Sequence, residues 1–280
     1  MLDLLRRLAP RRSPIRRLPH PQTAARALPR RRTPLAHPLA ALVAASLFLA
    51  PPLAAQSVGG MLYAYRPHDD ERARFDEGYR AHLEWHRAAA DTLPWYGWDI
   101  VAGKRMGEFV DGTFGIAFAA LDRRVDPAGD AAHAARSFTP HARATGQWAV
   151  RLRPDLGTAT PLEARTHGGD LVQVVKYTLP VGHQARFEAV LQRVRAGAER
   201  ARLLPYTVYE TVAGGSDAEL TVFVWRSGMA AFDDDARDPT SAIRRALPAE
   251  LGAALRAESE LWRLRRDLTL LPGRETAANR

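Results

Sequence analysis

The sequence of 280 residues predicts an α+β protein in which one βαββαβ unit occurs twice. The prediction rests on an internal repeat and on the alternation of strand-like and helix-like segments within each copy. Short motifs recur in the same order at offsets of 112, 111, 111 and 112 residues, a regularity that chance hardly produces. The matching pairs are Ala73-Arg74-Phe75 with Ala185-Arg186-Phe187, Leu93-Pro94 with Leu204-Pro205, Val101-Ala102-Gly103 with Val212-Ala213-Gly214, and Leu152-Arg153-Pro154-Asp155-Leu156 with Leu264-Arg265-Arg266-Asp267-Leu268.

We interpret residues 58–156 and 170–270 as tandem copies, with a linker over 157–169 and a tail over 271–280. The first copy predicts a strand over 60–66, a helix over 70–90, strands over 95–102 and 114–121, a helix over 128–136 and a strand over 147–153. The second predicts a strand over 171–177, a helix over 184–201 that Pro205 follows, a hairpin of 206–212 and 220–225, a helix over 242–258 and a strand over 261–270.

This element order is that of the split βαβ, or ferredoxin-like, unit. One unit covers one face of its sheet with helices and leaves the other face apolar and open, so two units can bury these faces against each other. We therefore expect an intramolecular α/β barrel. By element order and duplication, residues 58–270 resemble a tandem member of the dimeric α/β-barrel superfamily, the group of antibiotic-biosynthesis-type monooxygenases, NIPSNAP-type proteins and chlorite dismutase relatives. For an enzyme, the resemblance implies cofactor-free oxygenase, isomerase or lyase chemistry.

Residues 1–55 are typical of a secretory signal peptide with a long basic region. Ten arginines precede an uncharged stretch over 38–55, which ends in the small residues Ala54 and Ala55. The unbroken apolar part, 39–50, has twelve residues, fewer than the roughly 20 of a membrane-spanning helix. We expect cleavage near Ala55 and a periplasmic or secreted protein without membrane contact, with an uncleaved anchor as the alternative. Arg31-Arg32 also loosely resembles a twin-arginine export signal.

The net charge of +9 belongs to this segment. Residues 1–55 contain ten arginines and one aspartate, which leaves 30 basic and 30 acidic residues in 56–280. A formally neutral domain has no basic surface for nucleic acid, so we expect no nucleic-acid partner. The absence of cysteine excludes disulfides, thiolate nucleophiles and cysteine-ligated metal sites.

The two copies differ clearly in their long helix. At an offset of 112, His82 aligns with Val194 and His86 with Ala198, on the inward side of the helix. Two imidazoles at i and i+4 share one helix face, where they can bind a substrate or transfer protons, and we take His82 and His86 as the candidate catalytic residues. The spacing also suits a metal, but no HExxH motif or evident third ligand accompanies it, so no metal is expected. Two buried, hydrogen-bonded histidines are the structural alternative.

The hairpin of the first copy is predicted to be about six residues longer than that of the second. Residues 103–115 would then form a loop with four glycines, which permit close backbone approach or simply a long turn. We expect Lys104, Arg105, Glu108 and Asp111 to lie on this loop, over the ligand. The glycine spacing matches neither a GxGxxG motif nor a phosphate-binding loop, so no nucleotide is implied.

Aromatic residues are also concentrated in the first copy. Three of the six tryptophans, Trp85, Trp95 and Trp98, fall within fourteen residues, and Tyr63 and Tyr65 alternate along the first strand. Core packing accounts for such residues. As a functional alternative, they would form the walls of a pocket for a small hydrophobic or aromatic molecule.

The sequence thus supports competing functions. We expect a small-molecule site in the first copy, between helix 70–90 and the sheet. One alternative is a non-catalytic envelope protein whose aromatic patch binds a partner chain, and an oligomer is compatible with either. Another is metal or haem binding; the superfamily resemblance would make His183, in the turn before the second long helix, an axial haem ligand. The only asparagine is Asn279, so the asparagine used by haem-degrading monooxygenases of the superfamily is missing.

Overall fold

The computed structural model describes residues 58–158, 170–215 and 218–272. The first repeat contains β1 (Val58–Pro67), α1 (Arg72–Ala88), β2 (Tyr96–Ala102), β3 (Phe109–Ala117), α2 (Phe118–Leu121), α3 (Pro127–Ser137) and β4 (Ala142–Leu152). The second contains β5 (Leu171–Leu179), α4 (Gln184–Gly197), β6 (Tyr206–Ala213), β7 (Ala218–Arg226), α5 (Pro239–Ala246), α6 (Ala249–Ala254) and β8 (Arg256–Leu264). The predicted signal segment, most of the linker and most of the tail lie outside the described residues.

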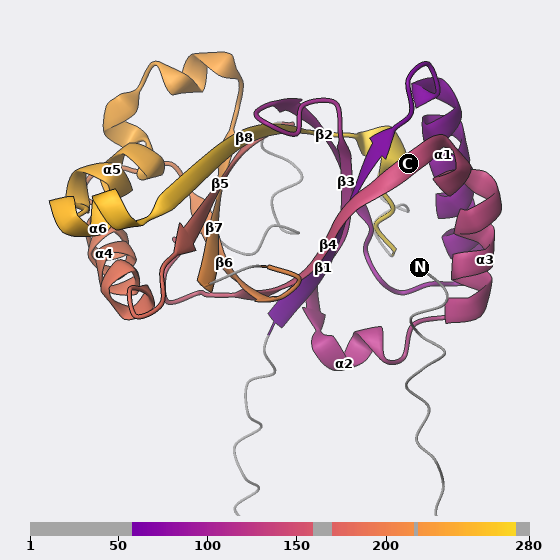
Figure 1. Cartoon of the computed structure of the whole chain (residues 1–280), viewed down its shortest axis with the longest axis horizontal. Coiled ribbons are helices and arrows are strands. Elements are labelled where there is room, and N and C mark those ends of the chain that lie inside the picture. Colours follow the sequence, from indigo (N-terminus) through magenta and orange to yellow (C-terminus); the bar gives the residue numbers. More distant parts are fainter. Residues whose placement is uncertain (1–57, 159–169, 216–217, 273–280) are drawn as a thin grey trace, which may run out of the picture. The chain divides into compact units, whose positions relative to one another are not determined.

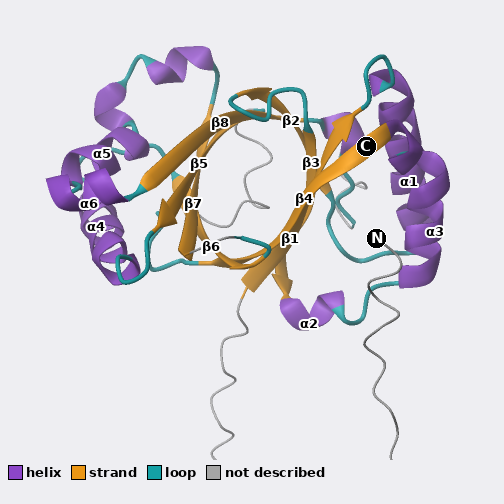
Figure 2. Ribbon diagram, viewed as in Figure 1, coloured by secondary structure: helices purple, strands orange, loops and turns teal. Residues whose placement is uncertain are grey.

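The strands form one closed antiparallel barrel in the order β1-β3-β2-β8-β5-β7-β6-β4. Each repeat contributes the same sheet, β4-β1-β3-β2 and β8-β5-β7-β6, and the two sheets join at β2–β8 and β4–β6. This is the expected pair of ferredoxin-like units closed into an intramolecular α/β barrel. Figures 1 and 2 show the helices outside the ring of strands, with α1 and α3 on one side and α4 to α6 on the other.

Alternating strand residues build separate cores on the two faces of the sheet. Along β5, Val172 and Val174 point into the barrel, where they join a core cluster with Trp98 and Trp262. Farther along the strand, Val175 and Tyr177 point outward and pack beneath α4 to α6. The first repeat has a corresponding outer cluster beneath α1 and α3. Among the described residues, no helix is long and apolar enough to cross a membrane.

The predicted loop over 103–115 is wrong from residue 109 onward. β3 begins at Phe109, five residues before the predicted strand, and residues 118–121 are helical. The strand registers place Tyr96 opposite Gly112 and Thr207 opposite Phe223, so the two hairpins have the same span and the six-residue insertion does not exist. β3 pairs with strands on both sides, which outweighs the weak strand propensity of its glycines. A Cβ on Gly112 would come within 3.0 Å of the Met61 carbonyl oxygen, so this glycine permits close strand approach.

The predicted helix over 242–258 is also interrupted. α5 ends at Ala246, Leu247 and Pro248 are extended, and α6 begins at Ala249. The chain then enters β8 at Arg256, five residues before the predicted last strand, because residues 256–263 pair in continuous register with β5. The apolar residues keep a helix-like spacing past the end of α6, so the sequence predicted too long a helix. The first residues of β8 are a strand because they pair with β5, which is distant in sequence.

Candidate functional site

Helix α1 carries two buried histidines to the outer face of the first repeat's sheet. Its buried side chains follow helical spacing and form one stripe toward the sheet. His82 and His86 are only 6% and 4% exposed, and Val194 and Ala198 in the second repeat are buried as well. Both imidazoles therefore occupy the inward positions that the alignment of the repeats indicates.

Asp130 of α3 completes a group of three converging side chains. Nε2 of His82 lies 3.2 Å from Nε2 of His86 and 3.1 Å from Oδ1 of Asp130, and 3.6 Å separates His86 Nε2 from Asp130 Oδ1. The other oxygen of Asp130 lies 3.6 Å from the Arg124 guanidinium. Burial raises the pKa of Asp130, but the hydrogen bond from His82 and the charges of His82, His86 and Arg124 outweigh it and lower the pKa.

Asp91 orients His86 from the opposite side of the ring. Its Oδ2 lies 2.8 Å from Nδ1 of His86 and accepts a second hydrogen bond, of 2.9 Å, from the indole of Trp95. The Leu93 amide donates to Oδ1. Burial raises the pKa of Asp91, but these three hydrogen bonds lower it overall. Because an ionised carboxylate only accepts, Nδ1 of His86 carries a proton and donates it to Asp91, while Nε2 is directed at His82 and Asp130.

His133 contacts His82 in the way that Asp91 contacts His86, through the Nδ1 atom of the ring. Its Nδ1 lies 3.1 Å from Nδ1 of His82, so one of these two nitrogens donates to the other. Desolvation, followed by the charges of His82 and Arg136, lowers the pKa of His133 and favours a neutral ring. Asp130 and His133 were not predicted, because nothing in their own helix distinguishes them; only the packing of α3 beside α1 brings them to the histidines.

His82, His86 and Asp130 line a pocket of 120 Å³ between α1, α3 and the sheet, whereas Asp91 and His133 do not. Of the residues predicted to bind ligand, Tyr63, Tyr65, Trp95 and Asp111 line it together with His82 and His86. The remaining lining residues are Tyr79, Arg124, Asp130, Ala131, Ala134 and Phe138.

Asp111 is the most unusual side chain of the pocket. It is 5% exposed, its Oδ2 accepts a 2.8 Å hydrogen bond from the Tyr79 hydroxyl, and its Oδ1 has no hydrogen-bond partner among the described residues. Burial raises the pKa of Asp111 to about 8 despite the opposing hydrogen bond from Tyr79. The carboxyl group is therefore largely protonated at pH 7 and can donate a hydrogen bond. Burial likewise raises the pKa of Tyr63 to about 12.

The second repeat has aliphatic residues at the equivalent positions. β1 pairs Tyr63 with Asp111, whereas β5 pairs Val175 with Val222 at the same place in its sheet. At the 112-residue offset, Leu191 stands for Tyr79 and Val194 for His82. Val175, Leu191, Val194 and Val222 all belong to the apolar core beneath α4 to α6. The fold thus tolerates an entirely aliphatic interior here, and only the first repeat replaces it with titratable groups.

Two of the predicted tryptophans lie elsewhere. Trp98 is fully buried inside the barrel, on the other face of the sheet from the histidines. Trp85 is half-buried on α1 and stacks on His82, with the ring centroids 6.0 Å apart, but does not line the pocket. Because Trp95 and Trp98 are 6% and 0% exposed, they cannot form the surface patch of the envelope-protein alternative.

The predicted loop residues Lys104, Arg105 and Glu108 are not brought over the histidines either. Lys104 and Arg105 pair with Glu258 and Glu260 of β8, and Glu108 accepts hydrogen bonds from Arg66 and Thr145. Of these residues, Arg105, Thr145, Glu258 and Glu260 line a cavity at one mouth of the barrel. Asp111 lies within β3, where its side chain faces the helices. Lys104, Arg105 and Glu108 lie in the turn before β3, away from that face.

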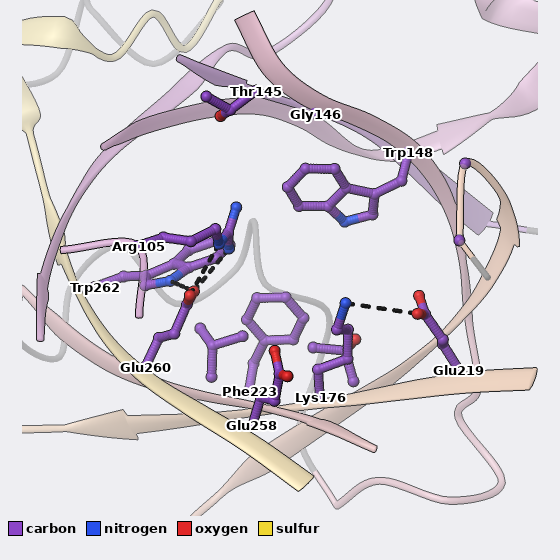
Figure 3. A pocket seen from close by; sticks show the side chains of 14 residues that line it. Arg105, Thr145, Gly146, Trp148, Lys176, Glu219, Phe223, Glu258, Glu260 and Trp262 are labelled. Atoms are coloured by element: carbon purple, nitrogen blue, oxygen red, sulfur yellow. Dashed lines mark hydrogen bonds and ion pairs between the residues drawn. The ribbon is translucent and has the colours of Figure 1, made fainter. Parts of the chain in front are cut away.

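This barrel mouth holds a second cavity, of 330 Å³ (Figure 3). Arg105 forms two hydrogen bonds with Glu260 and lies 5.4 Å and 5.9 Å from the ring centroids of Trp148 and Trp262. Lys176 and Glu219 form an ion pair at 3.5 Å. The charged groups in this cavity are thus paired with one another, unlike Asp111.

The described residues do not fit a haem group. His183 precedes α4 in the second repeat and lines neither cavity, and the barrel-mouth cavity has no histidine in its lining. The 120 Å³ pocket is smaller than the roughly 300–1,000 Å³ of pockets that enclose drug-sized ligands.

Three solved structures are similar to this chain over most of its length. An anthrone oxidase-like protein has a TM-score of 0.48 and 12% identity and covers 79% of this chain and 96% of its own. Chlorite dismutase from Candidatus Nitrospira defluvii in complex with imidazole has a TM-score of 0.49 and 10% identity, with coverages of 76% and 93%. A proposed monooxygenase from Lactobacillus acidophilus NCFM has a TM-score of 0.47 and 11% identity, with coverages of 76% and 98%.

No family model and no curated protein matches the sequence. The strand order of the described residues is the one that the repeat predicts. The chain is thus an α/β barrel made of two ferredoxin-like repeats, and its chemistry has to be argued from its own side chains.

Proposed function

We propose that this protein binds a small molecule in the pocket of the first repeat, between α1, α3 and the sheet. The observation that carries the proposal is the replacement of an aliphatic core by Tyr63, Tyr79, His82 and Asp111, where the second repeat has valines and a leucine. Burying polar groups lowers stability unless they are well paired, so stability alone favours the composition of the second repeat.

A purely structural hydrogen-bond network is the simplest competing explanation. It accounts for Asp91, whose carboxylate receives three hydrogen bonds. It does not account for Asp111, because a buried carboxyl oxygen without a partner within the described chain loses hydration and gains nothing. A ligand that hydrogen-bonds to this oxygen supplies the missing interaction.

The pocket defines the class of ligand by its size and chemistry. A cavity of about 150 Å³ is enough to hold benzene, so 120 Å³ accommodates one ring at most. Aromatic side chains form much of the wall, and the protonated Asp111 offers a hydrogen-bond donor. We therefore propose a single-ring aromatic molecule that carries an acceptor oxygen.

If the protein is an enzyme, the same groups support proton transfer. Asp111 would donate to the ligand oxygen, and His86 would accept a proton through the Nε2 lone pair that its bond to Asp91 leaves free. This is the kind of step with which oxygenase-like or isomerase-like chemistry can begin. The similarity to a monooxygenase-type structure concerns the fold alone, so any oxygenase-like chemistry has to rest on the side chains of this pocket.

The test measures the binding of phenol, with toluene as the probe of similar size that lacks oxygen. We expect saturable phenol binding by calorimetry and at least tenfold weaker binding of toluene, because only phenol can pair with Asp111. The Tyr63→Val/Asp111→Val variant, which restores the pair found in the second repeat, should lose phenol binding. The Lys176→Met variant at the barrel mouth is the matched control and should keep it. Equal binding by the wild type and the valine variant would overturn the proposal.

We also propose that the protein is exported as a periplasmic or secreted protein, on the basis of the signal-like order of residues 1–55. Mass spectrometry of protein expressed from the full-length sequence should give a chain that begins close to Gln56, recovered outside the cytoplasm. Full-length protein in the cytoplasm would contradict this proposal without affecting that of the pocket.

A further inference from the structure

The geometry points to a metal centre: we propose that His82, His86 and Asp130 bind one divalent transition-metal ion at the end of the pocket. The inference rests on the proposed function insofar as the metal would face the same pocket. It can nevertheless be tested without any organic ligand.

The distances within the group fit a metal site. A metal with ligands at about 2.0–2.2 Å in tetrahedral geometry holds neighbouring ligand atoms about 3.3–3.5 Å apart. The three separations observed here are 3.1, 3.2 and 3.6 Å. Two imidazole nitrogens and one carboxylate oxygen are also a donor set that zinc and iron(II) accept, with positions left open for a substrate or water.

The hydrogen-bond partners prepare both histidines for metal binding. Asp91 holds the proton of His86 on Nδ1 and leaves Nε2 free, an arrangement that recurs behind metal-binding histidines. His133 can play the same part for His82, because its Nδ1 can accept a hydrogen bond from Nδ1–H of His82. Arg124 lies beside the other oxygen of Asp130 and leaves Oδ1 directed at the histidines.

The hydrogen-bonded alternative fits the same distances less well. The 3.6 Å between Nε2 of His86 and Oδ1 of Asp130 exceeds the roughly 3.2 Å upper limit of an ordinary N–H···O hydrogen bond, whereas it suits two ligands of one metal ion. A cation at the centre would interact with all three atoms at once.

The experiment measures binding of cobalt(II) and zinc(II) to the purified full chain after removal of metal by a chelator. We expect one ion per chain and a visible cobalt(II) spectrum of low-coordinate type that zinc(II) abolishes. The His82→Val/His86→Ala variant restores the residues of the second repeat and should lose this binding entirely. Asp130→Asn should weaken affinity at least tenfold, and Asp91→Asn, which alters only the support of His86, by about 10- to 100-fold.

His68→Gln is the matched control, because His68 is an exposed histidine at the start of the turn before α1. It should bind like the wild type. Circular dichroism and the thermal midpoint establish that each variant is folded. Substoichiometric binding by the wild type, or equal binding by the His82→Val/His86→Ala variant, would overturn the metal centre.

The two proposals fail separately. If metal-free wild-type protein binds phenol and the Tyr63→Val/Asp111→Val variant does not, the pocket is supported whatever the result of the metal experiment. One metal per chain without phenol binding supports the metal centre and removes the proposed ligand class. One nitrogen lone pair cannot serve both roles, so a confirmed metal also removes Nε2 of His86 as the proton acceptor.

Discussion

Replacing Asp111 with asparagine should stabilise the protein at neutral pH and leave it unchanged in acid. The side chain keeps nearly the same shape and can still accept the Tyr79 hydrogen bond, but it no longer ionises. Burial raises the pKa of Asp111 to about 8 in the folded protein, compared with the ordinary value of 3.8 for an aspartate carboxyl group. Between these two pH values the unfolded chain loses a proton that the folded chain retains, so unfolding becomes easier as the pH rises.

The size of the effect follows from this difference in pKa. At pH 7 the pH lies about three units above the pKa of the unfolded carboxyl group, and each unit corresponds to about 1.4 kcal/mol. The wild type should therefore be about 4 kcal/mol less stable than Asp111→Asn at pH 7, and the two should agree within about 1 kcal/mol at or below pH 4. Since whole domains have about 5–15 kcal/mol of stability, this difference is easily measured.

The assay is urea unfolding followed by tryptophan fluorescence in chelator-containing buffer at pH 4.0, 5.5, 7.0 and 8.5. The difference between the two proteins should grow up to about pH 8 and then level off. Tyr79→Phe provides an internal check: the hydrogen bond from Tyr79 lowers the pKa of Asp111, so its loss should extend the growth to higher pH. A difference that stays constant from pH 4 to 7 would refute a buried, protonated Asp111.

Two further predictions concern the scaffold. Arg226 is 1% exposed and donates hydrogen bonds to Asp238, Gln173 and the Ala231 carbonyl. Arg226→Met removes these bonds and should lower the free energy of unfolding by about 3–5 kcal/mol. A change below about 1 kcal/mol in urea unfolding would contradict this. Leu191→Ala removes a fully buried side chain of the second repeat and should cost about 2–5 kcal/mol in the same assay, while phenol and metal binding in the first repeat remain. Loss of either binding activity in folded Leu191→Ala protein would show that the two helical layers are coupled.

Local patterns in the sequence were sufficient to predict the order of strands and long helices. Alternating and helical spacing of apolar residues is written along each segment, and the 111- to 112-residue offset relates equivalent positions of the two repeats. The same offset drew attention to His82 and His86, because two histidines stand where the other copy has aliphatic residues. Tyr63, Tyr65 and Trp95 were also predicted at the site, on the weaker evidence of aromatic crowding.

Interactions between distant segments decided the rest. The start of β3 at Phe109 depends on pairing with β1 and β2, and that register, not the loop chemistry expected of a glycine-rich segment, places Asp111 beneath α1. The same turn carries Lys104 and Arg105 to the opposite face, at the barrel mouth.

By itself, then, the sequence determined a duplicated α+β chain and two inward-facing histidines, because periodicity and repetition are local properties. Only the tertiary structure decided what those histidines meet. Asp130 and His133 reach His82 because α3 packs beside α1, and Asp91 reaches His86 because the chain turns back after α1. A cluster of side chains from separate elements forms only through the packing of those elements, which no single segment encodes.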